Sequence, residues 1–207
     1  MKKLFTVLVA VSMILPATKT FAQYYMGQVN ISLGYGYPNL IGSVFEFYET
    51  NDGYNATSLG PMYLKGEYGI TDRIGLGLSI AYAANKVTYT STYTDYDSLG
   101  NPIEEDYEYE IKRTTLSVLG RVNFHFGDFE KFDPYFGVGM GYRNANWTFT
   151  STQPGYENST ELASFLPFGF DFTVGARYYF NDFIGVYAEL GIAKSPVQAG
   201  VCCRFGG

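Results

Sequence analysis

The sequence predicts an all-β protein: an eight-stranded antiparallel transmembrane β-barrel whose strands follow one another as an up-and-down meander. Three observations lead to this fold. Apolar side chains recur at every second position in eight segments of the 207-residue chain. The alternate positions are rich in glycine and carry scattered charges. Beyond residue 22 no apolar run reaches 18 residues, which excludes a protein that crosses a membrane with helices.

Each segment has an apolar face formed by alternate residues. The first four faces are Val29, Ile31, Leu33, Tyr35 and Tyr37; Met62, Leu64, Tyr68 and Ile70; Ile74, Leu76, Leu78, Ile80 and Tyr82; and Leu116, Val118, Val122, Phe124 and Phe126. The last four are Phe136, Val138, Met140 and Tyr142; Phe168, Phe170, Phe172, Val174, Tyr178 and Phe180; Ile184, Val186, Leu190 and Ile192; and Val197, Ala199, Val201, Cys203 and Phe205. Aromatic residues gather at both ends of these segments, as expected for the two membrane interfaces.

The opposite face is small and polar. Thirteen strand glycines lie on it, whereas only Gly66 and Gly120 fall on the apolar face. An eight-stranded barrel has room inside only for the side chains that fill it, so the bulky face must point outward to lipid. The predicted lumen network consists of Lys65, Glu67, Arg121, His125, Arg143, Asp171, Arg177, Glu189 and Arg204. Because a buried charge needs a partner, we expect a static plug of ion pairs, with a gate that switches partners as the alternative.

The lengths of the connections predict the orientation. Long gaps span 38–59, 85–112 and 148–166, and shorter ones follow the even-numbered strands. Short turns belong to the periplasmic side of such barrels, which puts both chain termini in the periplasm. Strand parity predicts three-residue turns at 71–73 and 181–183.

The N-terminus predicts a signal peptide over residues 1–22, followed by the barrel domain over 23–207. Lys2 and Lys3 precede an apolar run from Leu4 to Leu15, and Ala22 ends a stretch suited to cleavage. A buried N-terminal helix or strand is the alternative. Cleavage leaves 11 basic against 20 acidic residues, a net charge of −9. The full-length value of −6 already argues against nucleic acid as a partner.

Two stretches carry a family resemblance, GEYGITDRIGLG at 66–77 and DPYFGVGMGY at 133–142. With the final strand 197–205, they resemble the small eight-stranded outer-membrane barrels of Gram-negative bacteria, the family of the membrane domain of outer membrane protein A. The resemblance implies an outer-membrane location and contact with its lipid. It also implies that the barrel assembly machinery recognises the C-terminal strand through Phe205. We expect no peptidoglycan-binding domain after the barrel, so that family role is not carried over.

The acidic segment 85–112 is the predicted site for a surface ligand. It contains five tyrosines between residues 89 and 109, and tyrosine provides a large contact area at low entropic cost. Its carboxylates could instead bind calcium or simply remain solvated, and the regular spacing of a calcium loop is missing. We therefore expect no metal and no cofactor.

The function predicted is a structural or surface-interaction (adhesion-like) role, with long extracellular loops on a plugged barrel. A narrow transport path for ions or small apolar molecules is the alternative, and a soluble secreted barrel is a further one. A lipid-modifying enzyme is less favoured, because the single histidine, His125, lies at the periplasmic end of its strand. The adjacent Cys202 and Cys203 point to opposite faces of the last strand, so neither a zinc site nor a disulfide framework is expected.

Overall fold

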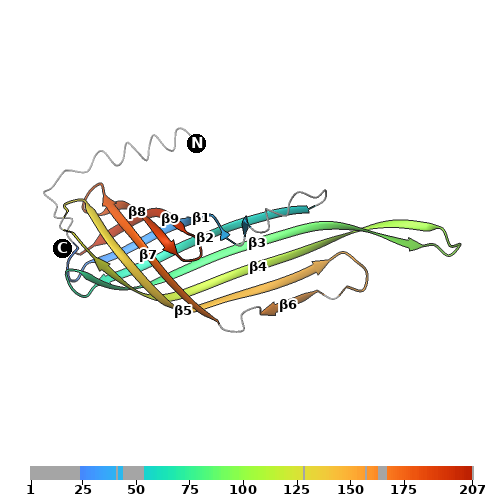
Figure 1. Cartoon of the computed structure of the whole chain (residues 1–207), viewed down its shortest axis with the longest axis horizontal. Helices are drawn as coiled ribbons and strands as arrows, with labels where there is room; N and C mark the ends of the chain where they lie inside the picture. Colours follow the sequence, from blue (N-terminus) through green and yellow to red (C-terminus); the bar gives the residue numbers. More distant parts are fainter. Residues whose placement is uncertain are drawn as a thin grey trace.

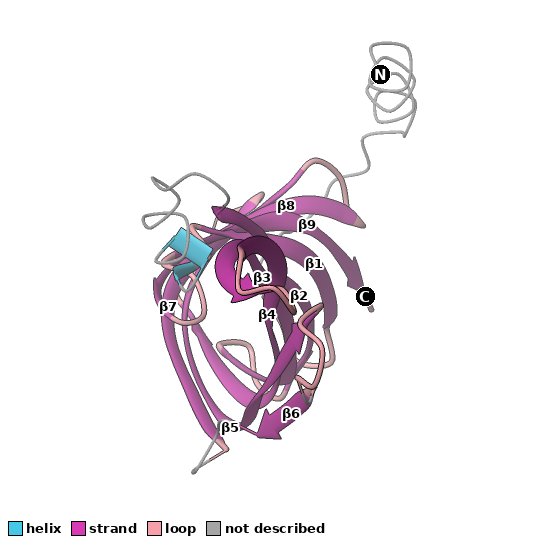
Figure 2. Cartoon of the chain, turned by 90° about the vertical axis from the view of Figure 1, so that its right-hand side faces the viewer, coloured by secondary structure: helices cyan, strands magenta, loops and turns pink. Residues whose placement is uncertain are grey.

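The computed structural model describes residues 24–40, 42–43, 54–127, 129–156, 158–162 and 167–206. Strands make up most of this part of the chain and enclose a single barrel (Figures 1 and 2). The predicted signal peptide, residues 1–22, lies outside the described residues. No helix in the described ranges is long and apolar enough to cross a membrane.

Eight strands form the closed wall, and one short strand is added to it. The strands are β1 (Val29–Tyr37), β2 (Tyr54–Gly69), β3 (Ile74–Tyr96), β4 (Pro102–His125), β5 (Phe132–Ser151), β6 (Ser159–Leu162), β7 (Phe168–Tyr179), β8 (Ile184–Ile192) and β9 (Val197–Phe205). Strands that follow one another pair antiparallel, except that β7 pairs with β5 and not with β6, and β9 returns to pair with β1. Among the described strands, β6 alone stands outside the ring, against the end of β5. The predicted eight-stranded meander is confirmed.

The turns at one end of the barrel have the predicted length. The Ile70 amide donates to the Ile74 carbonyl over 2.9 Å, and the Phe180 amide donates to the Ile184 carbonyl over 3.0 Å. Each bond closes a three-residue turn, at 71–73 and at 181–183. We call this end of the barrel the short-turn end, and the opposite one the hairpin end. The first strand begins and the last strand ends at the short-turn end, where Val29 pairs with Phe205.

The connections at the hairpin end differ from the prediction. Most of segment 85–112, predicted to be a loop, continues β3 and β4 as a paired hairpin out to Tyr96 and Pro102. The second strand likewise begins at Tyr54, and β5 runs to Ser151. Amino-acid composition explains these longer strands, because Thr, Tyr and Val favour extended structure even where apolar and polar residues do not alternate.

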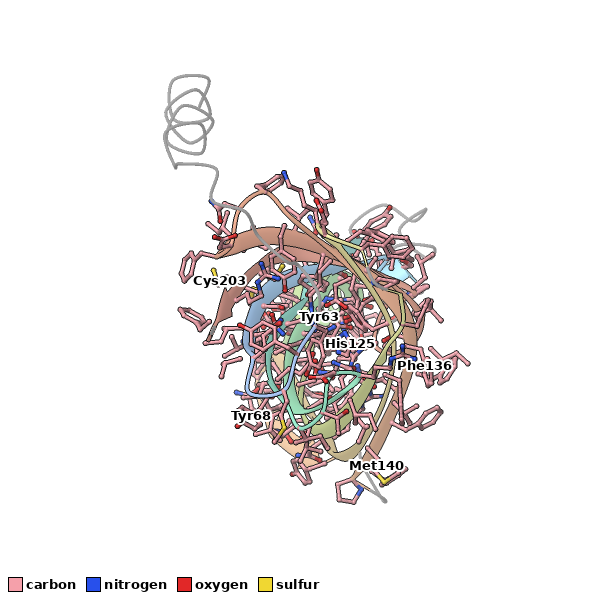
Figure 3. The ribbon with its side chains drawn as sticks, turned by 90° about the vertical axis from the view of Figure 1, so that its left-hand side faces the viewer. Tyr63, Tyr68, His125, Phe136, Met140 and Cys203 are labelled. Atoms are coloured by element: carbon pink, nitrogen blue, oxygen red, sulfur yellow. The ribbon has the colours of Figure 1, made fainter. Side chains whose placement is uncertain are left out.

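The two faces of the wall differ as the alternation requires. Tyr68, Phe136 and Met140 project outward, whereas Tyr63 and His125 point into the lumen (Figure 3). Glycine on the inner face makes room for large inward side chains: a Cβ atom at Gly34 would collide with the Tyr187 hydroxyl. At the outward-facing Gly66 a Cβ would meet nothing within 4 Å. The apolar exterior and the polar interior are those of a barrel whose surroundings are lipid.

Candidate functional site

The nine residues of the predicted lumen network all come from the inner face of the wall. Eight of them are buried; Arg143, at the hairpin end, is half-buried. Arg121 is 3% exposed and Glu189 only 1%, so protein groups must replace the water around these charges. The structure brings seven of the nine together with Asp133 in two clusters and leaves Arg143 and Arg204 outside them.

The first group, the His125 cluster, lies at the short-turn end and comprises Glu67, His125, Asp133 and Arg177. His125 Nδ1 lies 2.6 Å from Asp133 Oδ1, and Nε2 lies 2.7 Å from Glu67 Oε1. Arg177 bridges the same two carboxylates, with Nη1 3.1 Å from Asp133 Oδ2 and Nη2 bonded to Glu67. Both ring nitrogens need a proton to donate to both acids. With an imidazolium, this cluster is electrically neutral.

The second group, the Lys65 cluster, lies nearer the middle of the barrel and comprises Lys65, Arg121, Asp171 and Glu189. Lys65 Nζ is 2.7 Å from Glu189 Oε2, and Arg121 Nη2 is 3.1 Å from the same oxygen. A longer pair of 3.9 Å joins Arg121 Nη1 to Asp171 Oδ2. Two cations and two carboxylates again balance. Tyr135 completes the site by donating to Glu189 Oε1 over 2.7 Å.

Between the clusters the lumen holds a void of only about 10 Å³. Residues of both clusters line it, among them Lys65, Glu67 and Arg177. A volume of this size is at the lower limit for one water molecule. The described side chains therefore fill the cross-section of the barrel at this level.

Sequence reasoning missed several members of this interior. Four tyrosines fill the lumen beside the charges, and Asp133 belongs to the His125 cluster; the tyrosines are Tyr63, Tyr135, Tyr179 and Tyr187. Their parity was the available signal, because each occupies the glycine-bearing side of its segment. Tyr24, which precedes β1, also stacks on His125 with ring centroids 3.5 Å apart. The two-residue alternation could not predict this contact, because Tyr24 lies outside the strands.

Three predicted residues of β9 and β5 lie apart from the clusters. Arg204 Nε donates to the Asp182 carbonyl over 3.1 Å, and its guanidinium lies 4.3 Å from the centroid of the Tyr179 ring. Phe205 ends β9 on the outer face, where its ring meets that of Phe183 edge-on at 4.9 Å. Arg143 Nε donates to Ser117 Oγ over 3.1 Å at the hairpin end. Near Phe205, Cys202 is buried and Cys203 half-buried, and both are free thiols.

The outer part of the β3–β4 hairpin is the second candidate site. Within the described residues, β2 pairs with β3 only as far as Tyr89 and β5 pairs with β4 only as far as Tyr109, after which the Thr152 amide still donates to the Glu108 carbonyl. The ribbon then runs free to the turn at Asp97–Gly100 and projects past the rest of the barrel (Figure 1).

One side of this ribbon, the tyrosine face, carries Tyr89, Tyr93, Tyr107 and Tyr109. The rings of Tyr89 and Tyr109 stack with centroids 5.2 Å apart, and those of Tyr93 and Tyr107 lie 5.9 Å apart. A hydrogen bond with the Tyr93 hydroxyl raises the pKa of Tyr109 to about 12. Tyr109 is therefore a neutral hydrogen-bonding group at physiological pH.

The other side of the ribbon, the acidic face, sets carboxylates opposite threonines. Its cross-strand pairs are Thr90 with Glu108, Thr92 with Asp106, and Thr94 with Glu104. Thr92 Oγ1 donates to Asp106 over 2.6 Å. At the tip, hydrogen bonds from Asn101 hold the pKa of Asp97 below its ordinary value. No group of three or more His, Cys, Asp or Glu side chains in the described ranges is arranged to hold a metal ion.

A closed antiparallel barrel with an apolar outside and a charged, filled inside defines a transmembrane barrel of the outer membrane of Gram-negative bacteria. The chain belongs to the outer membrane protein beta-barrel domain family, whose sequence profile matches residues 6–198. No curated protein sequence matches the chain.

Solved structures similar to the chain are barrels of the same kind. The attachment invasion locus protein Ail of Yersinia pestis, in complex with the heparin analogue sucrose octasulfate, is 14% identical with a TM-score of 0.44, covering 87% of this chain and 99% of Ail. The N-terminal β-barrel domain of Pseudomonas aeruginosa OprF is 17% identical with a TM-score of 0.40, covering 87% and 98%. The outer membrane protein OprG of Pseudomonas aeruginosa is 15% identical with a TM-score of 0.42, covering 89% and 98%.

Proposed function

We propose that this protein is a surface-interaction protein that holds the β3–β4 hairpin outside the cell as a binding arm on a closed barrel. One observation carries the proposal: strand pairing continues without a break from Ala83 and Thr115 to Tyr96 and Pro102. Beyond the Tyr89–Tyr109 pair, where β2 and β5 no longer flank it, the arm runs to Tyr96 and extends roughly 23 Å at about 3.3 Å per residue. Such an arm brings its two faces to a partner at a defined distance from the membrane.

The arrangement of the ends supports this orientation. Tight turns lie at one end of the barrel and the long hairpin at the other, the pattern of barrels whose short turns are periplasmic. Both termini of the barrel then face the periplasm. Residues 1–22 act in this proposal as the signal peptide that is removed on export, and the barrel assembly machinery recognises the C-terminal strand.

The chemistry of the arm indicates the class of partner. Tyrosine side chains suit protein recognition because they combine contact area with few rotatable bonds. The acidic face carries Glu104, Asp106 and Glu108, and the described ribbon from Thr90 to Glu108 has no basic residue. A protein surface with Lys and Arg side chains complements this charge. The filled lumen argues against the alternative of a transport path.

The test replaces residues 90–108 by Asn-Gly, a two-residue turn suited to joining Tyr89 to its cross-strand partner Tyr109. Bacteria carrying the intact protein should adhere to a surface coated with a Lys- and Arg-rich peptide, and bacteria carrying the shortened protein should not. Heat-modifiable migration on gels checks that the shortened barrel still folds. Equal adhesion of the two strains would reject the arm as the binding element.

Two further variants separate the faces of the arm. Tyr93→Ser with Tyr107→Ser alters the tyrosine face and leaves the charge of the ribbon unchanged. Glu104→Gln, Asp106→Asn and Glu108→Gln together neutralise the acidic face and leave its shape nearly unchanged. If charge selects the partner, the second variant loses most adhesion to the basic peptide, and added salt weakens adhesion of the intact protein.

A further inference from the structure

The hairpin end of the lumen contains a hollow that the proposed arm does not use. It has a volume of about 210 Å³ and is lined by β2 to β5, by the segment after β1 and by the turn between β8 and β9. Three of its lining residues are cations, Arg113, Arg143 and Lys194. They form a site that we call the outer-mouth site.

Neutral groups hold all three cations in place. Lys194 Nζ donates to the carbonyl oxygens of Ala81 at 2.9 Å and Thr115 at 3.1 Å. Arg143 donates to Ser117 Oγ and, over 3.3 Å, to the Phe170 carbonyl. The Arg113 guanidinium lies 5.5 Å from the centroid of the Trp147 ring.

These contacts fix the positions of the three cations but bring no negative charge to them. Among the side chains that the structure describes, no carboxylate lies within 4.0 Å of the nitrogens of Arg113, Arg143 or Lys194. The two clusters deeper in the lumen are each neutral, so they are not a pool of free negative charge. Like charges gathered in a half-buried hollow repel one another unless an anion joins them.

The environment of Lys194 reports this repulsion. Burial lowers the pKa of its ammonium group to about 7, and the positive charges of Arg143 and Arg113 act in the same direction. The other lining residues of the hollow, such as Asn39, Pro61 and Ala83, do not titrate. An anion bound here would restore the proton on Lys194 by offsetting both effects.

We propose that the outer-mouth site binds a phosphate or sulfate group of an extracellular ligand. Guanidinium groups present paired N–H donors that match the oxygens of tetrahedral anions, and an ammonium adds a third charge. A hollow of about 210 Å³ admits such a group with part of the molecule that carries it. The group can come from a free anion or from the phosphorylated headgroup of an outer-leaflet lipid.

The experiment measures binding to the full barrel in uncharged detergent by calorimetry, with inorganic sulfate as the probe. Saturable binding should weaken by at least about tenfold in the Arg113→Gln, Arg143→Gln variant, because two charge-assisted contacts are lost. The control is Lys86→Gln, which removes an exposed cation paired with Glu110 at 2.5 Å on the hairpin. No saturable binding, or equal loss in the control, would overturn the proposal.

A pH series tests the same site without relying on the folding of the arginine variant. Sulfate keeps its charge between pH 6 and pH 8, whereas Lys194 loses its proton as the pH rises through about 7. The intact protein should bind sulfate more tightly at pH 6, and Lys194→Gln should remove this dependence. An unchanged pH dependence in Lys194→Gln would also overturn the proposal.

Vesicles identify the source of the group. One set of vesicles consists of an uncharged lipid with added lipid A that keeps its phosphates. The second set consists of the same uncharged lipid with dephosphorylated lipid A. Competition with sulfate by phosphorylated lipid A alone assigns a lipid headgroup as the ligand. Sulfate binding that neither lipid displaces assigns a free anion. Both results support the site, and they are independent of whether the hairpin arm binds a protein.

Discussion

Single residues in this wall are tested best at two glycines that face opposite sides of it. At Gly200, in the seam between β1 and β9, an added Cβ would collide with the Leu33 carbonyl oxygen and come within 2.5 Å of the Gly34 Cα. At Gly66, on the outer face of β2, an added Cβ meets nothing within 4 Å. Both positions lie in strands, so the backbone cost of glycine is similar.

We expect Gly200→Ala to destabilise the barrel by about 1–3 kcal/mol, the usual cost of overpacking a well-filled interior. Gly66→Ala should be neutral or slightly stabilising, because it removes freedom from the unfolded chain without a clash. Urea unfolding in detergent, followed by the gel shift of the folded barrel, measures both. Equal stability of the two variants would show that the seam tolerates the extra atom.

The alternation of inward and outward residues predicted only part of the barrel interior. Alternation identified the inner face of each segment, and so the side on which Glu67 and Arg177 lie. It could not predict that these two residues pair, because they are 110 positions apart in the sequence and their strands, β2 and β7, are not neighbours in the wall. Alternation also could not show which inward residues complete a cluster, so it did not identify Asp133 as the partner of His125 and Arg177.

Within a single long strand such as β3, the alternation of apolar residues predicts the barrel part but not the extension beyond it. Between Ile74 and Tyr82, one face of β3 must meet lipid, and the apolar alternation follows. Beyond Asn85 the outward positions of β3 lose the apolar alternation, so β-propensity was the remaining signal. The run of Thr and Tyr from Thr88 to Thr94 carries that signal.

The last strand makes a prediction of its own. Phe205 lies outward at the end of β9, paired with Val29 of β1, so β9 is the strand that closes the barrel. If the assembly machinery reads this ring, Phe205→Ala should lower the amount of folded protein in the outer membrane several-fold. Refolding of the purified variant into detergent should be almost unaffected, since the ring is exposed on the outer face, edge-on to Phe183.

Pulse-labelling and heat-modifiable migration measure the assembly of the Phe205 variant in cells. Phe183→Ala is its matched control, because it removes the other ring of the same edge-on pair, at 4.9 Å, from the turn before β8. A similar defect in both variants would assign the effect to the ring pair rather than to recognition of the C-terminal strand.

For the whole molecule, the decisive property is that the barrel is closed by its own side chains. Two neutral clusters and four tyrosines occupy the lumen from the short-turn end to its middle and leave a void of only about 10 Å³ between the clusters. Opening a continuous water path would separate pairs such as Lys65 with Glu189, 2.7 Å apart. Removing one partner of such a buried pair costs about 3–5 kcal/mol, which sets the scale for separating the two charges. At RT of about 0.6 kcal/mol, an open state with this cost is populated below one part in a hundred.

We therefore expect no stable unitary conductance from the protein in planar bilayers. The control is a variant with Tyr135→Ala and Glu189→Ala, which removes two side chains from the wall of the void and leaves Lys65 and Arg121 without their shared carboxylate. Its water-filled lumen should pass more ions than that of the intact protein, at equal amounts of heat-modifiable barrel. Regular single-channel steps from the intact protein would mean that the clusters exchange partners and act as a gate, and the transport path would then replace the static plug.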